Sequence, residues 1–161
     1  MQRYGLAGGV SDIPRGEAYG FRAALRAMGR PGTIEVLKGA EEPAPLSPAA
    51  SALLLILCDQ PTGLHIAPSH HNHAVRDWIT FQTSAPDYPD RSVTLIIGRP
   101  ELQPPGAVLR GPGIEHEAAL DLPELAAFRA NRAQFPLGFG AYLTAGSQVA
   151  GLPRSTQVTA D

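Results

Sequence analysis

The stretch AYGFRAALRAMGRPGTIEVL, residues 18–37, decides the fold class because a helical pattern runs directly into a strand pattern. Its first half carries apolar residues at helical spacing: Ala18, Phe21, Ala24, Leu25 and Met28. The helix is predicted to stop at residues 29–32, where Pro31 cannot extend it and Gly32 can take a positive φ. Residues 33–37 are rich in β-branched side chains, which predicts a strand.

The middle of the chain continues this alternation. Ser47 and Pro48 form a good N-cap and N1 pair, so the Ala- and Leu-rich residues 49–59 are predicted to be a buried helix, with a strand as the alternative. A turn then leads into a short strand at residues 64–67. Ile79 and Phe81 alternate with polar neighbours, which predicts a half-buried strand at residues 78–83.

The last part predicts two strands, at residues 93–97 and 107–110, joined by a Pro-rich hairpin loop at 99–106. A helix over residues 123–133 and a final hairpin turning at Gly146 and Ser147 follow. The expected fold class is therefore α/β, layered α/β/α with a mixed sheet, in one domain covering residues 1–161.

Composition narrows the possible partners. Thirteen Lys and Arg against fifteen Asp and Glu give a net charge of −2 and no basic stripe for a phosphate backbone, so no nucleic acid is expected. The apolar run at residues 52–58 is far below the roughly 20 residues that span a bilayer. No signal-like segment begins the chain, and Cys58 cannot form an internal disulfide, so the expected location is the cytoplasm.

Three imidazoles lie within four residues, at His70, His71 and His73. Such a tight run could supply two zinc ligands at most, with His65, His116 or a carboxylate completing the shell. The alternative is a polar loop, which is the more common use of such a stretch. We therefore expect no metal, and keep these histidines as weak candidates.

No nucleophilic or phosphate-binding motif is present in the sequence. A Gly-x-Ser-x-Gly elbow is absent, and the apolar surroundings of Cys58 are expected to raise the pKa of its thiol. The Gly-rich segments lack the Gly-Lys-Ser/Thr of a P-loop and the spacing of a dinucleotide fingerprint. The sequence therefore predicts no catalytic residue.

Two arginines beside tight turns are the remaining candidates. Arg110 precedes Gly111 and Gly113, and Arg154 precedes Ser155 and Thr156. A guanidinium beside exposed backbone N–H groups suits a phosphate or phosphonate, so these six residues are candidates for a ligand site or an interface. The alternative is an ordinary surface ion pair or a contact with a partner subunit.

A series of short motifs occurs in the order seen in the PhnH family. These motifs are Phe21-Arg22, Met28, Arg30-Pro31-Gly32, Phe81-x-Thr83-x-Ala85-Pro86, Gly111-Pro112-Gly113-Ile114, Phe135-Pro136-Leu137-Gly138 and Leu152-Pro153-Arg154-Ser155-Thr156. The ordered set covers nearly the whole chain, which therefore resembles the PhnH family of the carbon–phosphorus lyase core complex. The sequence departs from the family in a shortened segment around residues 87–92 and in Gly140, where the family usually has an acidic residue.

The resemblance implies a fold similar to that of pyridoxal-phosphate-dependent transferases but without that cofactor, since Lys38 is the only lysine. It also implies a homodimer in isolation and assembly with subunits G, I and J. The implied role is accessory: to support transfer of a phosphonate to the ribose C1 of ATP with release of adenine. The alternatives are a stand-alone metal-dependent hydrolase using the three clustered histidines, or a module that binds nucleotides or phosphonates.

Overall fold

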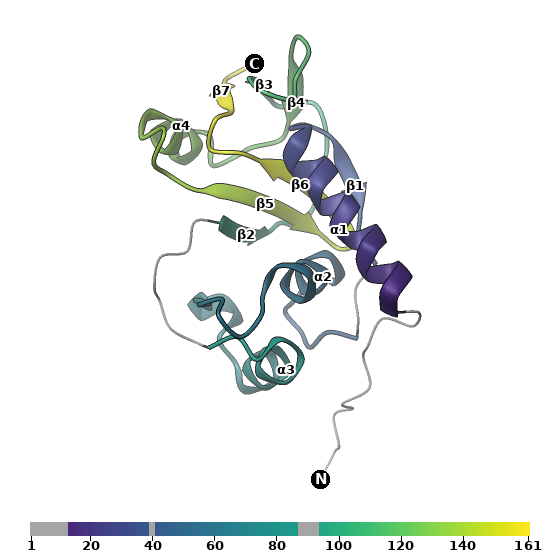
Figure 1. The fold of residues 1–161 in the computed structure, drawn as a ribbon. Helices are drawn as coiled ribbons and strands as arrows, with labels where there is room; N and C mark the ends of the chain where they lie inside the picture. Colours follow the sequence, from purple (N-terminus) through teal and green to yellow (C-terminus); the bar gives the residue numbers. More distant parts are fainter. Residues whose placement is uncertain (1–12, 39–40, 87–93) are drawn as a thin grey trace.

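The computed structural model describes residues 13–38, 41–86 and 94–161. A four-stranded main sheet lies at its centre, and a second, three-stranded sheet lies to one side of it (Figure 1). In chain order the elements are α1 (Ile13–Gly29), β1 (Ile34–Val36), α2 (Pro48–Leu57), the 3-10 helix η1 (Pro68–His70), α3 (His73–Thr83), β2 (Thr94–Gly98), β3 (Ala107–Arg110), β4 (Ala118–Leu120), α4 (Leu125–Ala133), β5 (Gly140–Ala145), β6 (Gln148–Leu152) and β7 (Gln157–Thr159).

The main sheet has four strands in the order β1-β6-β5-β2. It is mixed, because β2 runs parallel to β5 while β5, β6 and β1 are antiparallel. Alternate side chains of β5 enter opposite cores: Ala141, Leu143 and Ala145 join one, and Tyr142 joins the other. The predicted mixed α/β architecture is thereby confirmed.

The two faces of the main sheet are covered differently (Figure 1). Helices α1 and α2 pack on one face, and α3 packs on the outside of α2. The other face is covered by α4 and by a second, antiparallel sheet in the order β4-β3-β7. One outer layer is thus mostly a sheet, a departure from the predicted α/β/α layering, because the three-residue strands β4 and β7 are too short to carry a local sequence signal.

Helix α1 confirms the predicted amphipathic helix and its turn. Its inner face consists of the small residues Ala23, Ala24 and Ala27, all buried, which let the helix approach β6 closely. At the contact, a Cβ on Gly151 would collide with the carbonyl of Ala27. The chain then turns at Gly32, whose φ of +91° is a conformation that favours glycine.

The strand predicted at residues 78–83 is wrong, since this segment belongs to α3. The helix begins earlier, where the Asn72 side chain accepts a hydrogen bond of 2.9 Å from the Val75 N–H. Its buried face consists of Val75, Ile79 and Thr83, four residues apart. Phe81, which the predicted strand placed beside Ile79, is 59% exposed.

Two further predictions are corrected. The strand expected at residues 64–67 reduces to a single bridge at Leu64, whose N–H donates to the Pro86 carbonyl at 3.1 Å. The hairpin expected around residues 99–106 does not form, because β2 pairs with β5 whereas β3 lies in the second sheet. The physical reason is that β2 lacks polar alternation and is therefore a better partner in a covered parallel pair.

The remaining elements agree with the sequence. Helix α2 begins with the predicted cap, in which the Ser47 side chain accepts a hydrogen bond from the Ala50 N–H at 3.2 Å. Helix α4 and strand β3 form where they were expected. Strands β5 and β6 form the predicted final hairpin, which turns at Gly146 with a φ of +53°.

Candidate binding groove along strand β2

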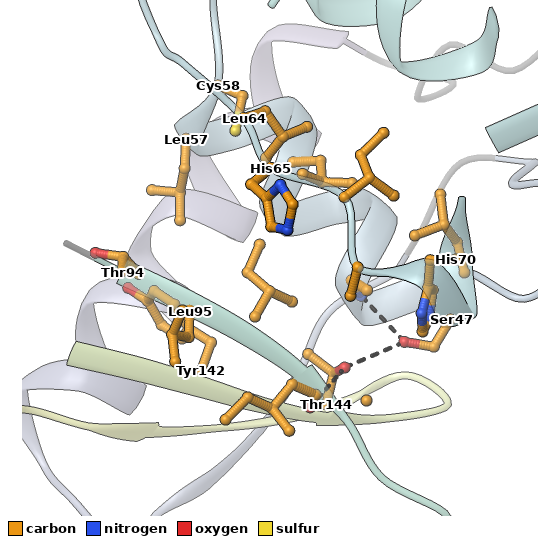
Figure 2. A pocket seen from close by; sticks show the side chains of 18 of the residues that line it. Ser47, Leu57, Cys58, Leu64, His65, His70, Thr94, Leu95, Tyr142 and Thr144 are labelled. Atoms are coloured by element: carbon orange, nitrogen blue, oxygen red, sulfur yellow. Dashed lines mark hydrogen bonds between the residues drawn. The ribbon is translucent and has the colours of Figure 1, made fainter. Parts of the chain in front are cut away.

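A groove of about 1230 Å³ runs between strand β2 and the layer formed by α2 and the chain segment that follows it. Figure 2 shows Thr94, Leu95 and Leu57 at one end, with Ser47, Thr144 and His70 at the other. Most of the lining is apolar. The lining side chains include Leu54 and Leu57 of α2, Leu64 and Ile66 of the following segment, Val75 and Ile79 of α3, and Leu95, Ile96 and Ile97 of β2.

The lining residues reveal how the groove meets the main sheet. From β5 only alternate residues contribute, Gly140, Tyr142 and Thr144, as expected where a cavity lies over one face of a sheet. From β2 and the residues after it, every residue from Thr94 to Pro100 contributes. The groove therefore covers one face of the sheet at β5 and wraps around the outer edge of β2.

Strand β2 ends the main sheet and turns part of its backbone toward this outer edge. The Arg99 N–H donates to the Thr144 carbonyl at 2.7 Å, which fixes the side of the strand that faces β5. Because backbone groups alternate along a strand, the N–H and C=O groups of Ile96 and Gly98 point away from β5. Within residues 13–38, 41–86 and 94–161, no strand pairs with β2 on that side.

The hydroxyl groups of the groove already serve the fold. The Ser47 hydroxyl, besides capping α2, donates to Thr144 Oγ1 at 3.4 Å, and the Thr144 hydroxyl donates to the Ile97 carbonyl at 3.4 Å. The Tyr142 hydroxyl donates to the Ala24 carbonyl at 3.2 Å, and burial raises the pKa of this phenol. These contacts join the sheet to the two helices above it.

Cys58 has the environment that the sequence predicts for an unreactive thiol. Burial raises the pKa of its thiol, and the negative charge of Asp59 raises it further. An elevated pKa favours the protonated thiol at neutral pH, which is the wrong state for a nucleophile.

His70 also lies in the groove, where it forms a hydrogen bond of 3.0 Å with the neighbouring Ser69.

The three clustered histidines are separated by secondary structure. His70 ends η1, and His73 begins α3 on the far side of the Asn72 cap, with His71 exposed between them. Across the part of the chain that the structure describes, no three His, Cys, Asp or Glu side chains converge as a metal site requires. In the same part, no helix has the length and apolar character to cross a bilayer.

Four of the six predicted site residues, Arg110, Gly111, Ser155 and Thr156, lie at one end of the second sheet. Arg110 forms an ion pair of 2.8 Å with Glu117, and both side chains are more than half exposed. The adjacent turn lies close to residues 155–156, since a Cβ on Gly111 would be 3.3 Å from the Ser155 carbonyl oxygen. Thr156 is buried, and its hydroxyl has no hydrogen-bond partner in the described structure. Ligand binding by this group stays a prediction.

The other two predicted site residues, Gly113 and Arg154, lie in two separate places. Gly113 has a φ of +84° and lies against the carbonyl of Gly29, the last residue of α1, where there is no room for a Cβ. Arg154 instead lies at the rim of the β2 groove with Met28 and Gly140. Its side chain is exposed, and no carboxylate in the described structure lies within ion-pair distance of it.

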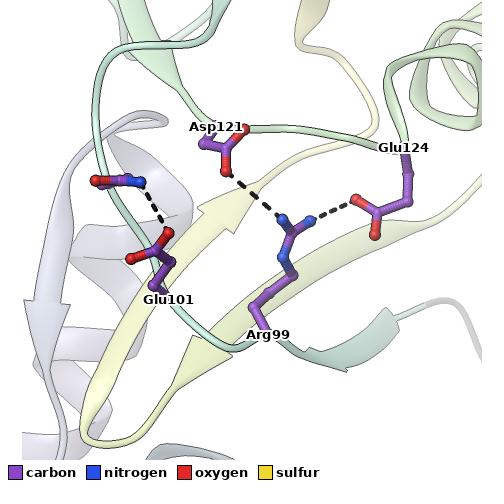
Figure 3. Close-up of polar contacts among 5 residues, drawn as sticks. Arg99, Glu101, Asp121 and Glu124 are labelled. Atoms are coloured by element: carbon purple, nitrogen blue, oxygen red, sulfur yellow. Dashed lines mark hydrogen bonds and ion pairs between the residues drawn. The ribbon is translucent and has the colours of Figure 1, made fainter.

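Arg99 is a buried arginine that the sequence alone did not single out. Its side chain is only 7% exposed and forms ion pairs with Glu124 at 2.5 Å and with Asp121 at 3.8 Å (Figure 3). The two carboxylates precede α4, far from Arg99 in sequence, and no local spacing predicts the contact. The pairs tie the end of β2 to the start of α4, so this guanidinium is not available for an anionic ligand.

The fold and the groove define a mixed α/β protein whose concave surface along a sheet edge is mainly apolar. The chain belongs to the PhnH family: the family model described as bacterial phosphonate metabolism protein (PhnH) matches residues 8–88 and 85–159. This confirms the resemblance seen in the ordered motifs.

A curated relative from Rhizobium meliloti (strain 1021) is named alpha-D-ribose 1-methylphosphonate 5-triphosphate synthase subunit PhnH. It is 32% identical over 175 aligned positions, which cover 86% of this chain and 88% of the relative. The alignment is longer than the 161 residues of this chain, so the relative carries residues that have no counterpart here.

Proposed function

We propose that this chain is an accessory subunit of the carbon–phosphorus lyase machinery in organophosphonate catabolism. In the proposed role it supports a reaction in which the bond from ribose C1 to adenine in ATP breaks and a bond from C1 to a phosphonate oxygen forms. The chain supplies binding surface for that assembly and no reacting group of its own. Its proposed location is the cytoplasm.

The observation that carries this proposal is the match, over most of both chains, to a relative named as a subunit of a synthase. The site gives it physical support. The Ser47 and Tyr142 hydroxyls form structural hydrogen bonds and burial raises the pKa of the Cys58 thiol, whereas the walls of the groove are mainly apolar. Such a surface is better suited to association than to acid–base or nucleophilic chemistry.

The proposed partners are a second copy in isolation and subunits G, I and J in the complex. The proposed fold relationship is to pyridoxal-phosphate-dependent transferases, without the cofactor. A Schiff base needs a lysine, and the single lysine, Lys38, is exposed directly after β1 and does not line the groove. The groove therefore lacks the lysine that pyridoxal phosphate would require.

The test is co-purification from cells that grow on methylphosphonate. A tagged copy of the full chain should recover subunits G, I and J in constant ratio, as measured by quantitative mass spectrometry. The isolated chain should release no adenine from ATP and methylphosphonate. Recovery of the chain without other subunits, or turnover by the isolated chain, would contradict the accessory role.

A second candidate function is binding of a nucleotide or phosphonate at the groove, favoured by the Arg154 guanidinium at its rim, which pairs with no carboxylate of the described residues. Saturating ATP should then raise the melting temperature of the wild type, since a ligand at 100 times its Kd stabilises by about 2.7 kcal/mol. Arg154→Ala should abolish the shift. Arg110→Ala, which removes a guanidinium away from the groove, is the matched control.

A further inference from the structure

We propose that the outer edge of β2 and the groove beside it receive an extended, mainly apolar segment of another subunit of the synthase, which joins the main sheet as an additional strand. The inference rests on the proposed function and names the surface on which assembly occurs. The inference starts from a difference between the two strands that line the groove. Only alternate residues of β5 line it, whereas consecutive residues of β2 do. A cavity that wraps around a strand edge exposes backbone as well as side chains.

The exposed backbone of β2 suits a polypeptide. The N–H and C=O groups of Ile96 and Gly98 point outward, two residues apart, which matches the repeat of an extended chain. A strand added there would gain main-chain hydrogen bonds, and the apolar walls would receive its alternate side chains. The volume of about 1230 Å³ also exceeds the roughly 300–1000 Å³ of typical small-molecule pockets.

The side chains of β2 include none of those that normally protect an exposed edge. Its residues Thr94, Leu95, Ile96, Ile97 and Gly98 include no charge and no proline, whereas natural edge strands carry lysines, prolines or bulges. Such a sequence is typical of a strand that is covered on both sides. Among the residues that the structure describes, no strand pairs with β2 on its outer side.

The relative from Rhizobium meliloti is named as a subunit of a synthase, which favours another subunit of such an assembly as the source of an additional strand. We infer that this protein takes the additional strand from such a partner subunit. A second copy of this chain is the competing source, and the cross-link described below distinguishes the two.

Position 98 allows a test with a matched pair of variants. Proline at Gly98 removes an outward N–H and leaves the hydrogen bonds to β5 intact, and proline is tolerated on edge strands. Alanine at Gly98 keeps the N–H, and its Cβ would meet only His70 Nε2, at 4.0 Å. The full chain carrying Gly98→Pro or Gly98→Ala is co-expressed with the other synthase subunits, and partner yield is measured by mass spectrometry.

We expect Gly98→Ala to recover partners as the wild type does and Gly98→Pro to recover at least tenfold less, with a melting temperature close to that of the alanine variant. Should Gly98→Pro fail to fold, Leu95→Lys replaces it, because a lysine on the edge blocks strand addition without changing the backbone. A photo-cross-linker at position 95 of the wild type should join one short segment of a partner subunit.

The outcomes separate this inference from the proposed function. If the wild type recovers no partner, the accessory role itself fails. If Gly98→Pro and Gly98→Ala recover partners equally, assembly occurs elsewhere and only the edge inference fails. A cross-link from position 95 to a second copy of this chain would refute the partner subunit as the occupant.

Discussion

The two edges of the main sheet are built in opposite ways. Strand β1 has three residues, and its central Glu35 accepts two hydrogen bonds from the Arg26 guanidinium, at 3.0 and 2.9 Å. Strand β2 has five residues and no charged side chain. The first edge is short and charged, which discourages further pairing, whereas the second is long enough and apolar enough to invite it.

This difference indicates which side of the molecule is available for assembly. Strand β1 shows two ways in which this sheet protects an edge: the strand is short and it carries a charged residue. The absence of any such protection at β2, beside a groove lined by apolar side chains, is therefore informative. Variants that act on one edge at a time can test whether the two edges differ in the way this comparison requires.

The largest expected effect tests which backbone N–H groups of β2 point toward β5 and which point toward the groove. Ile97→Pro should remove a hydrogen bond to β5 and the packing of Ile97 against the core that contains Leu143, at a cost of about 3 kcal/mol or more. Gly98→Pro, one residue later, should cost less than about 1 kcal/mol. Thermal unfolding of the two variants should show a difference of at least about 5 °C.

The reverse order, with Gly98→Pro the less stable variant, would mean that the strand faces the other way. The groove would then border ladder hydrogen bonds already made to β5. Ile97→Val serves as the control, because it keeps the backbone N–H and removes one methylene from the same contact. It should cost about 1 kcal/mol.

The sequence predicted the elements whose signals are local. The cap at Ser47, the turn at Gly32 and the hairpin at Gly146 each depend on residues within a few positions of one another. Residues 78–83 alternate by chance and so predict a strand, whereas helix α3 starts within the histidine-rich segment for which the sequence favours a polar loop. The helical spacing of Val75, Ile79 and Thr83 is visible only when the segment is counted from Asn72.

The groove could not be predicted because distant segments form it. Its floor consists of β2 and β5, which pair although they lie some 46 residues apart in the sequence (Thr94 with Gly140). Helix α2 forms one of its walls. Loop length favoured a local hairpin for β2, and the partner strand is chosen by packing on both faces of the sheet. One signal was available: the apolar run of residues 93–97 lacks the polar alternation of a hairpin with a solvated face.

A second prediction uses the dependence of β2 on a single neighbour. The buried Asn131 holds the start of β5, donating to the Phe139 carbonyl and accepting from the Phe139 N–H, both at 2.9 Å. Asn131→Ala leaves both backbone groups unsatisfied and should cost about 2 kcal/mol, or about 5 °C in melting temperature. Hydrogen exchange should accelerate at β2 amides that bond to β5 more than at β1 amides, which depend on β6.

Gln134→Ala, an exposed change at the end of the same helix, is the control and should leave both strands as protected as in the wild type. Equal loss of protection at β1 and β2 would mean that the sheet opens as one unit. Strand β2 would then be no more loosely attached to the sheet than β1.

The smallest expected effect tests the charged edge. The hydrogen bonds from Arg26, with its positive charge, hold the pKa of Glu35 below its usual value of 4.5. A carboxylate whose pKa is lowered by folding stabilises the fold above the unfolded value and loses that contribution as pH falls through the folded value. The pair is partly exposed, so Glu35→Gln should lower the melting temperature by only about 2 °C at pH 7.

This difference between wild type and Glu35→Gln should persist down to about pH 5 and then shrink toward zero as the solution is acidified through the folded pKa. Glu117→Gln, which removes the exposed pair with Arg110, is the control. If the difference for Glu35→Gln were the same at every pH, its side chain would act through packing and not through charge. Strand β1 would then be protected by its shortness alone, and the comparison with the longer, uncharged β2 would depend on strand length.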